Sequence, residues 1–208
     1  MKIEYAQLIF DEYQEGQKLD PKDRNFVLQG ALDFLDKGEF SAGLALLRAL
    51  HFRDPNDATV IWKMGMALSD TGEIKEALKH LNRGAELLPN ESDLQVALGV
   101  ALLRDGQFAE AEAALEKAVA LNPNSPHALA NLGSCLRRKP GCLQRAEQLC
   151  RSSIGISSKN LVAWTALAQA CEAQGNLPEA QKAYRRSLEL SPEGQVADFC
   201  RARLKQME

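Results

Sequence analysis

The sequence repeats itself with a period of 34 residues. Two residue types mark the period, namely the prolines Pro55, Pro89 and Pro123 and the glycines Gly38, Gly72 and Gly106. A period of this length is typical of an array in which each repeat is one supersecondary unit that buries its apolar face only against its neighbours. The repeat therefore favours an open array of stacked units over one closed globular core.

Alignment on these marks divides the chain into five units, 24–57, 58–91, 92–125, 126–160 and 161–194. The fourth unit is one residue longer than the others. Two segments flank the units, 1–23 and 195–208.

Each unit contains two stretches of helical periodicity that a glycine separates. In the second unit, Ile61 and Leu68 share one helical face, Gly72 interrupts the chain, and Leu78 and Leu81 share the next face. Glycine suits the residue after a helix because it adopts the left-handed conformation without steric cost. Each unit is thus expected to be a helical hairpin.

Composition agrees with a wholly helical fold. The chain has 29 Ala and 31 Leu but only 7 Val, 6 Ile and 3 Thr, which are the β-branched residues that strands favour. This bias argues against sheet-based enzymes such as Rossmann, P-loop or barrel proteins.

Small and large residues recur at fixed places in the units. The eighth position holds Ala31, Gly65, Gly99, Gly133 and Ala168, and the twentieth holds Gly43, Ala77, Ala111, Ala146 and Ala180. Small side chains at both positions allow the two helices of a hairpin to approach closely. Asp57, Ser125 and Asn160 precede first helices and are expected to cap them.

With these positions the chain resembles the tetratricopeptide repeats over residues 24–194. The resemblance implies an all-α fold, a right-handed α-solenoid of about five helical hairpins with flanking N- and C-terminal helices. It also implies that the first helix of each hairpin lines a concave surface where ligands bind, mainly through the second, fifth, ninth, twelfth and thirteenth positions of a unit.

These positions predict a partner-binding surface. Its apolar part comprises Leu28, Leu32, Leu35, Trp62, Met66, Val96, Val100 and Leu103, and its basic part comprises Arg104, Arg137 and Arg138. An exposed apolar stripe is typical of an interaction site, and Trp and Met suit an anchor for an amphipathic helix. The alternative is that the N-terminal helix folds back and fills the stripe.

The fourth unit is strongly basic. Between Gly133 and Asn160 there are six basic residues and one acidic residue, a local charge of +5. This region could hold an acidic peptide segment through charge-assisted hydrogen bonds, or it could be ordinary surface charge.

The two flanking segments are both expected to contain helices. Segment 1–23 is amphipathic and unusually apolar for a terminus, so it is interpreted as a cap, with homodimer formation or occupation of the groove as alternatives. Segment 195–208 places Val196, Phe199, Cys200 and Leu204 opposite basic residues and is interpreted as a solvating last helix.

The sequence offers no catalytic, cofactor-binding or metal-binding motif. The five cysteines have no C-x-x-C spacing, so burial as small hydrophobic residues is favoured over a metal or redox site. A net charge of −3 disfavours nucleic acid as a partner, and the absence of a long apolar run predicts a cytoplasmic chain without membrane insertion.

The resulting prediction is a non-enzymatic scaffold or adaptor that binds a peptide or helix of a partner protein. The alternative is a secretion- or assembly-type chaperone that shields an aggregation-prone client. Leu28 and Leu32 stand where the clamp that grips heat-shock chaperone tails needs Lys and Asn, which argues against that use. The first two units are also somewhat similar to the helical-repeat chaperones of type III secretion.

Overall fold

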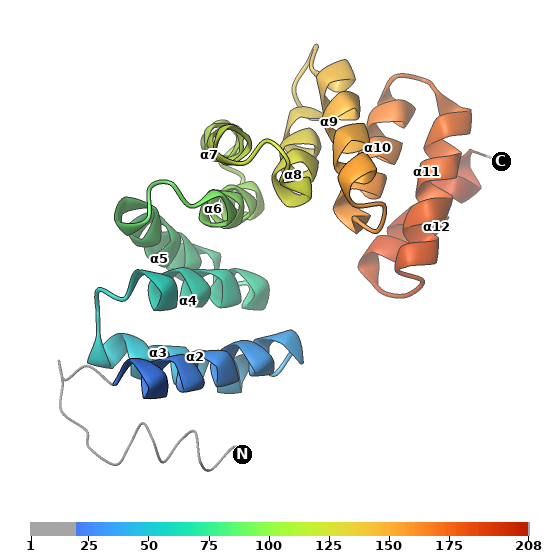
Figure 1. Ribbon diagram of the computed structural model, residues 1–208. Helices are drawn as coiled ribbons and strands as arrows, with labels where there is room; N and C mark the ends of the chain where they lie inside the picture. Colours follow the sequence, from blue (N-terminus) through green and yellow to red (C-terminus); the bar gives the residue numbers. More distant parts are fainter. Residues whose placement is uncertain (1–19, 208) are drawn as a thin grey trace. The chain divides into compact units, whose positions relative to one another are not determined.

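The fold of the described residues is entirely α-helical. The computed structural model describes residues 20–207, and within this range it contains helices α2 to α12 and no strand (Figure 1). The all-α prediction is confirmed. The predicted helix in segment 1–23 lies almost wholly outside the described residues.

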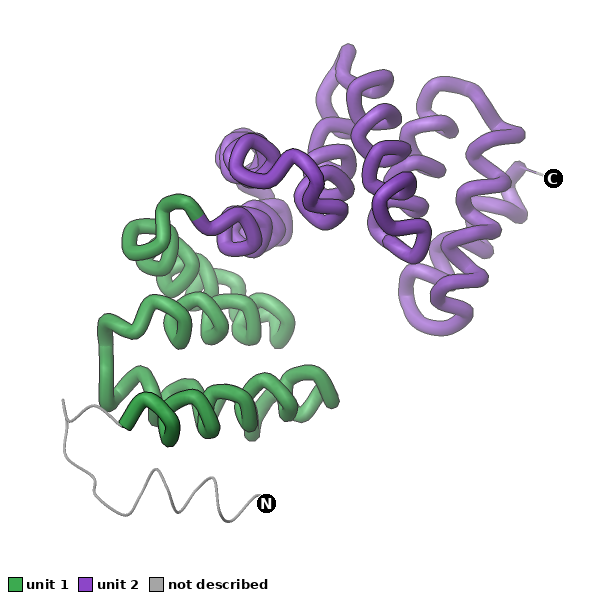
Figure 2. Tube along the Cα trace, viewed as in Figure 1, with its two compact units in different colours: residues 1–90 green, residues 91–208 purple. Residues whose placement is uncertain are grey.

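The chain divides into two compact units, residues 1–90 and residues 91–208 (Figure 2). The described part of the first unit contains α2 (Pro21–Asp36), α3 (Phe40–Arg53), α4 (Ala58–Thr71) and α5 (Ile74–Leu87). The second unit contains α6 (Ser92–Asp105), α7 (Phe108–Leu121), α8 (Pro126–Leu136), α9 (Leu143–Ile156), α10 (Leu161–Ala173), α11 (Leu177–Leu190) and α12 (Gln195–Gln206). Within each unit, consecutive helices pair as hairpins that stack in the manner of an α-solenoid.

Glycines on the first helices bring the two helices of a hairpin together. A Cβ atom added to Gly65 would lie 2.7 Å from the Leu81 side chain, and one added to Gly99 would lie 2.5 Å from the Leu115 side chain. Leu81 and Leu115 thus each pack on the glycine of their own hairpin. The close approach buries Leu81 and Leu115 completely.

The turns between paired helices use glycine as predicted. Gly72 and Gly106 follow α4 and α6 with φ values of 89° and 81°, and their backbone N–H groups donate to carbonyls of the preceding helix. No other residue type has a positive φ within 20–207, so the reversal of the chain depends on glycine there.

The three predicted N-terminal caps are all present. Asp57 accepts hydrogen bonds from the N–H groups of Thr59 and Val60, while Ser125 and Asn160 cap α8 and α10. Asn160 also donates to the Pro126 carbonyl at 3.0 Å, which ties the start of α10 to the start of α8.

The extra residue of the fourth unit lies in the α8–α9 connection. Helix α8 ends at Leu136, and α9 begins only at Leu143. Pro140 cannot continue a helix, and Gly141 takes a positive φ of 78°, so the chain reverses over a longer turn. This early end places Arg137 at the C-cap of α8.

Candidate functional site

The second unit contains a groove that is formed by α8, α10 and α12. One pocket of about 330 Å³ is lined by residues that include Arg137, Val162, Thr165, Gln169, Val196 and Phe199. A second pocket of about 450 Å³ is lined by Arg137, Gln169, Glu172, Ala173, Phe199 and Arg203. Because the two pockets share Arg137, Gln169 and Phe199, they form one continuous surface, which we call the C-terminal groove.

Three accessible apolar side chains face this groove. Val162 on α10 is 41% exposed, and Val196 and Phe199 on α12 are 36% and 38% exposed. Phe199 also packs edge-on against the buried Tyr184, with ring centroids 6.0 Å apart. Its ring is therefore held in place while one side remains open to a ligand.

Helix α12 was predicted to be a solvating last helix, and it also lines the C-terminal groove. Cys200 and Ala197 bury one side of it against the unit, but Val196 and Phe199 lie on the groove side. Sequence reasoning missed these two residues as site residues and treated them as packing positions. Their spacing of three on a terminal helix was the available signal.

Arg137 is the charged residue that both pockets share. Its Nε atom is buried and has no hydrogen-bond partner, and within residues 20–207 its guanidinium forms no ion pair. Burial lowers the pKa of Arg137, and the nearby charge of Arg138 lowers it further. An anion beside Arg137 would oppose both effects, because a nearby negative charge favours the charged guanidinium.

The other two charged residues of the groove neutralise each other. Glu172 accepts a hydrogen bond from Arg203 Nε at 3.2 Å and forms an ion pair with Arg203 Nη2. Glu172 also accepts a hydrogen bond from the Tyr184 hydroxyl at 2.8 Å. Burial raises the pKa of Tyr184 to about 12, so the hydroxyl remains a donor at neutral pH.

The structure separates Arg137 from the rest of the predicted basic region. Arg138 lies over the Phe108 ring, 5.1 Å from its centroid, and it does not line the groove. Lys139 pairs with Glu112 at 2.8 Å, and Arg145 pairs with Glu116 at 3.0 Å. Arg151 pairs with both Glu147 and Glu179.

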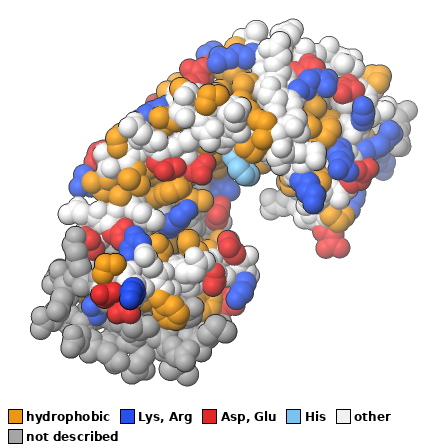
Figure 3. Space-filling view, viewed as in Figure 1, with side chains coloured by type: hydrophobic (Ala, Val, Ile, Leu, Met, Phe, Trp, Pro, Cys, Tyr) orange, Lys and Arg blue, Asp and Glu red, His pale blue; other side chains and the backbone are white. Residues whose placement is uncertain are grey.

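The local charge of +5 counted over residues 133–160 therefore does not correspond to one continuous positive surface. Carboxylates of neighbouring helices neutralise three of its six cations. Figure 3 shows basic, acidic and hydrophobic side chains intermixed on the visible face of the second unit.

The remaining predicted residues of the second unit lie on α6. Val96, Val100 and Leu103 are partly exposed, and Arg104 is exposed. None of them lines the C-terminal groove.

In the first unit, the predicted apolar residues divide between core and surface. Leu28 is only 8% exposed, so the expectation that it lies on an open surface is wrong. Leu35 packs against the backbone of α3, where a Cβ on Gly43 would lie 2.6 Å from the Leu35 side chain. Leu32 and Trp62 are partly buried, and Met66 is 37% exposed.

Trp62 has two further features. Its indole Nε1 is buried and has no hydrogen-bond partner among the described residues, and the Lys63 ammonium lies 3.9 Å from the ring centroid. A cation over the ring face adds to the stability of this side chain's position.

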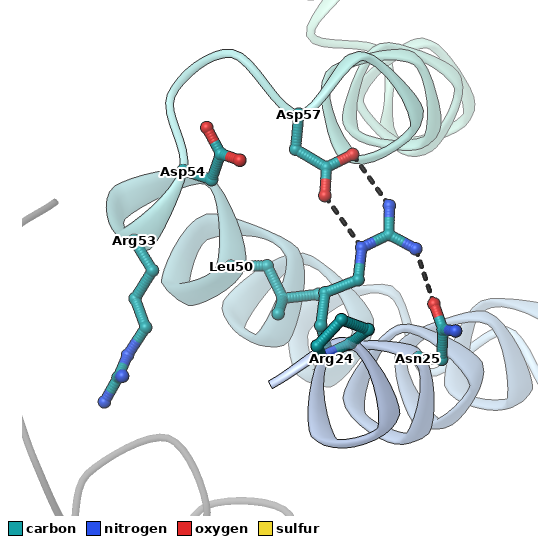
Figure 4. Close-up of a pocket in the computed structure, with 7 residues that line it drawn as sticks. Arg24, Asn25, Leu50, Arg53, Asp54 and Asp57 are labelled. Carbon is teal, nitrogen blue, oxygen red and sulfur yellow. Dashed lines mark hydrogen bonds and ion pairs between the residues drawn. The ribbon is translucent and has the colours of Figure 1, made fainter. Parts of the chain in front are cut away.

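The first unit also contains a pocket of about 340 Å³ where α2, α3 and α4 meet (Figure 4). Arg24 extends across it and donates to both carboxylate oxygens of Asp57 and to Asn25 Oδ1. Each of the three guanidinium nitrogens thus donates to a neighbouring side chain, and the bonds to Asp57 join α2 to the start of α4.

Four of the five cysteines are buried, as the sequence predicted. Burial raises the pKa of Cys150 to about 12 and that of Cys171 to about 11. Within residues 20–207, no three His, Cys, Asp or Glu side chains form a group that could hold a metal ion. In the same part of the chain, no helix is long and apolar enough to cross a membrane.

Comparison with known proteins identifies the repeats. Two sequence models, each described as a tetratricopeptide repeat, match residues 96–160 and 162–193. A search of curated proteins finds no significant match.

Solved structures share the fold. TTC0263, described as a thermophilic TPR protein in Thermus thermophilus, has a TM-score of 0.72 at 18% identity over 88% of this chain and 98% of that one. MamA has a TM-score of 0.61 at 24% identity over 84% and 96% of the two chains. YrrB, described as a TPR protein with an unusual peptide-binding site, has a TM-score of 0.60 at 20% identity over 85% and 90%.

Proposed function

The chain belongs to the tetratricopeptide-repeat family, and from this premise we propose that it is a non-enzymatic interaction scaffold whose C-terminal groove binds a segment of a partner protein. One observation carries the proposal. Accessible Val162, Val196 and Phe199 line one pocket together with Arg137, whose Nε has no hydrogen-bond partner within residues 20–207. Pockets with mainly apolar walls and a few polar groups are the usual form of ligand sites.

The size of the groove supports a peptide segment as its ligand. Each pocket falls within the range of about 300–1,000 Å³ that is typical of ligand sites, and the two adjoin. The peptide-binding site in the description of YrrB is consistent with this use of the fold. The likeness at 20% identity extends to the fold alone, so the residues of the groove carry the proposal.

We also propose a second contact surface on the first unit, with Trp62 and Met66 as its central residues and Leu32 as a further member. Met66 is exposed, and methionine adapts its shape to different apolar partners. Trp62→Ala should weaken partner capture and leave helical content unchanged. Unchanged capture by this variant would remove the first unit from the proposal.

A chaperone that shields an aggregation-prone client is the weaker alternative. Such a role calls for a broad apolar surface, whereas the C-terminal groove alternates apolar side chains with Arg137, Glu172 and Arg203. The two functions differ in a solution assay, because a chaperone would suppress the aggregation of a client and a scaffold would bind short peptides reversibly.

The experiment that tests the proposal selects binders from a displayed library of random linear peptides on the purified full chain. Enriched peptides are then titrated against the wild type, Val162→Glu and Ile156→Glu. Val162 lines the groove, and Ile156, which is 49% exposed at the end of α9, does not, so the second variant is a matched control.

Val162→Glu should weaken binding by about tenfold or more, because it replaces an apolar wall of the pocket with a carboxylate that competes with the ligand for the space beside Arg137. Ile156→Glu should leave the affinity unchanged. Failure to enrich any peptide, or equal affinity for all three proteins, would remove the groove as the binding site.

A further inference from the structure

Arg137 is the one side chain of the C-terminal groove whose charge no described residue balances. The groove contains three charged side chains, and two of them, Glu172 and Arg203, form an ion pair that leaves no net charge. Arg137 remains, with its Nε buried beside the apolar residues. A buried N–H donor without an acceptor is unfavourable, and a carboxylate from a ligand would supply the acceptor that Arg137 Nε lacks.

The position of Arg137 indicates which kind of carboxylate fits. Arg137 lines both pockets, so it lies where they adjoin and not at a closed end of the groove. A peptide that fills the apolar pocket can therefore continue past Arg137 into the second pocket. A ligand that continues past this point presents a side-chain carboxylate to Arg137, whereas a chain-terminal carboxylate would leave the second pocket empty.

The polar neighbours of Arg137 are suited to one carboxylate. Ser134 and Gln169 line the first pocket beside Arg137, and each has a side-chain donor. Thr165 is occupied, because its hydroxyl donates to the Leu161 carbonyl at 2.9 Å. One guanidinium with an amide and a hydroxyl can hold a single carboxylate group.

We infer that the C-terminal groove selects an internal acidic-apolar segment of a partner protein, in which a large apolar side chain enters the pocket of Val162, Val196 and Phe199 and a nearby Asp or Glu side chain pairs with Arg137. This inference rests on the proposed function and specifies its ligand. The segment contributes one essential acidic residue, and that residue lies within about one helical turn of the apolar one, because Arg137 lines the same pocket as Val162, Val196 and Phe199.

The test uses the peptides that are selected on the full chain from the random linear library. Enriched sequences should share Asp or Glu close to Leu, Ile, Met or an aromatic residue. Affinities are then measured for the wild type, Arg137→Gln and Arg138→Gln. Arg138 is the matched control because it is adjacent in sequence, is exposed and lies over Phe108 outside the groove.

Arg137→Gln should weaken binding by about 10- to 100-fold, the usual effect of losing a hydrogen bond to a charged group. Arg138→Gln should leave the affinity nearly unchanged. Circular dichroism of both variants should match that of the wild type, and thermal melting should show that both remain folded, because neither side chain forms an ion pair within residues 20–207.

Changes in the peptide complete a double-mutant cycle. Replacement of the acidic residue by Asn or Gln should weaken binding to the wild type but have little effect on binding to Arg137→Gln, since the pair is already broken. Amidation of the peptide C-terminus should change nothing. Higher ionic strength should weaken wild-type binding more than binding to Arg137→Gln.

The outcomes separate this inference from the proposed function. Peptides that bind through Val162 but tolerate loss of their acidic residue, or that lose affinity only on amidation, would overturn the inference and leave the groove as a binding site. An unchanged affinity for Arg137→Gln would also overturn the inference. Binding that is indifferent to Val162→Glu would overturn both.

Discussion

Arg24 and Asp57 form a two-point ion pair that joins α2 to the start of α4. Arg24 Nε lies 2.8 Å from Asp57 Oδ2, and Arg24 Nη2 lies 2.7 Å from Asp57 Oδ1. Asp57 is also the N-cap of α4. One carboxylate thus starts the second hairpin and ties it to the first.

Asp57→Ala should lower the free energy of unfolding by about 1–2 kcal/mol, because it removes a cap and leaves Arg24 without its partner. Arg24→Gln should have a smaller effect, because the cap on α4 remains. Urea denaturation of both variants checks the order. A larger loss for Arg24→Gln would show that the ion pair contributes more than the cap.

Because of the Asp57 carboxylate, we expect the stability of the protein to depend on pH in the acidic range. Burial opposes ionisation of Asp57, but hydrogen bonds from Arg24 and from backbone N–H groups outweigh it and lower its pKa below 3.8. Its contribution to stability is therefore present above pH 3.8 and is lost as the pH falls through the lowered pKa. Acid unfolding of the Asp57→Ala variant should lack the contribution of this carboxylate, which measurement of the free energy of unfolding against pH checks.

Substitution of two glycines, Gly133 and Gly155, distinguishes the effect of close packing on stability from the effect of helix propensity. A Cβ on Gly133 in α8 would lie 2.6 Å from Cys150 Sγ and 3.0 Å from the Ala146 carbonyl oxygen, while one on Gly155 in α9 would meet nothing within 4 Å. Gly133→Ala should destabilise the second unit, because overpacking costs about 1–3 kcal/mol and exceeds the gain in helix propensity.

Gly155→Ala is the matched control and should stabilise the protein by about 0.5 kcal/mol, the low end of the usual gain, because it lies in the last turn of its helix. Thermal melting of the two variants checks the difference in sign. A stabilising effect of Gly133→Ala would show that the α8–α9 contact is not as close as the structure has it.

The cysteines should differ in their reaction with thiol reagents. Burial raises the pKa values of Cys135, Cys150, Cys171 and Cys200, and all four are buried, whereas Cys142 is partly exposed in the turn before α9. The thiolate is the reactive form, so Cys142 should be alkylated first in the native protein. Mass spectrometry after brief iodoacetamide treatment checks this, with Cys142→Ser as the control. Early labelling of Cys150 would contradict the packing of the hairpin core.

The helices and turns were predictable because their signals are local or strictly periodic. Gly72 and Gly106 mark reversals of the chain, and Asp57, Ser125 and Asn160 mark helix starts. These effects depend on backbone conformation and on hydrogen bonds within a few residues. The structure confirms the glycine turns and the N-terminal caps.

The charge balance of the basic region was not predictable in the same way. Its partners lie about one repeat away in sequence, since Lys139 and Glu112 are separated by 27 residues and Arg145 and Glu116 by 29. A local count of charges overlooks these carboxylates. Arg137 differs from these neighbours because it lines the C-terminal groove, where no carboxylate of residues 20–207 pairs with it.

The burial of Leu28 and the accessibility of Phe199 show a second limit. Both residues occupy apolar positions on helical faces, and periodicity alone does not specify how completely the neighbouring helices cover each one. Leu28 belongs to a covered face and Phe199 to a partly open one. This difference depends on packing between helices, so the groove required the structure.

The edge-on pair of His51 and His80 predicts a pH dependence for the first unit. Their ring centroids lie 5.6 Å apart, and Glu76 lies 4.0 Å from His80 Nε2. Burial lowers the pKa of His80 below 6.5, and His51, Arg48 and Lys79 lower it further, while Glu76 opposes them. The folded first unit therefore favours the neutral imidazole.

Stability that depends on neutral His80 is present above pH 6.5 and is lost as the pH falls from 6.5 through the lowered pKa, because the unfolded chain takes up the proton first. The melting temperature should fall over this interval in the wild type and fall less in His80→Gln. Thermal melts between neutral and mildly acidic pH check this. Glu76→Gln should make the melting temperature fall more steeply, because it removes a nearby carboxylate that favours protonated His80. An identical pH profile for His80→Gln and the wild type would show that His80 is not the group responsible.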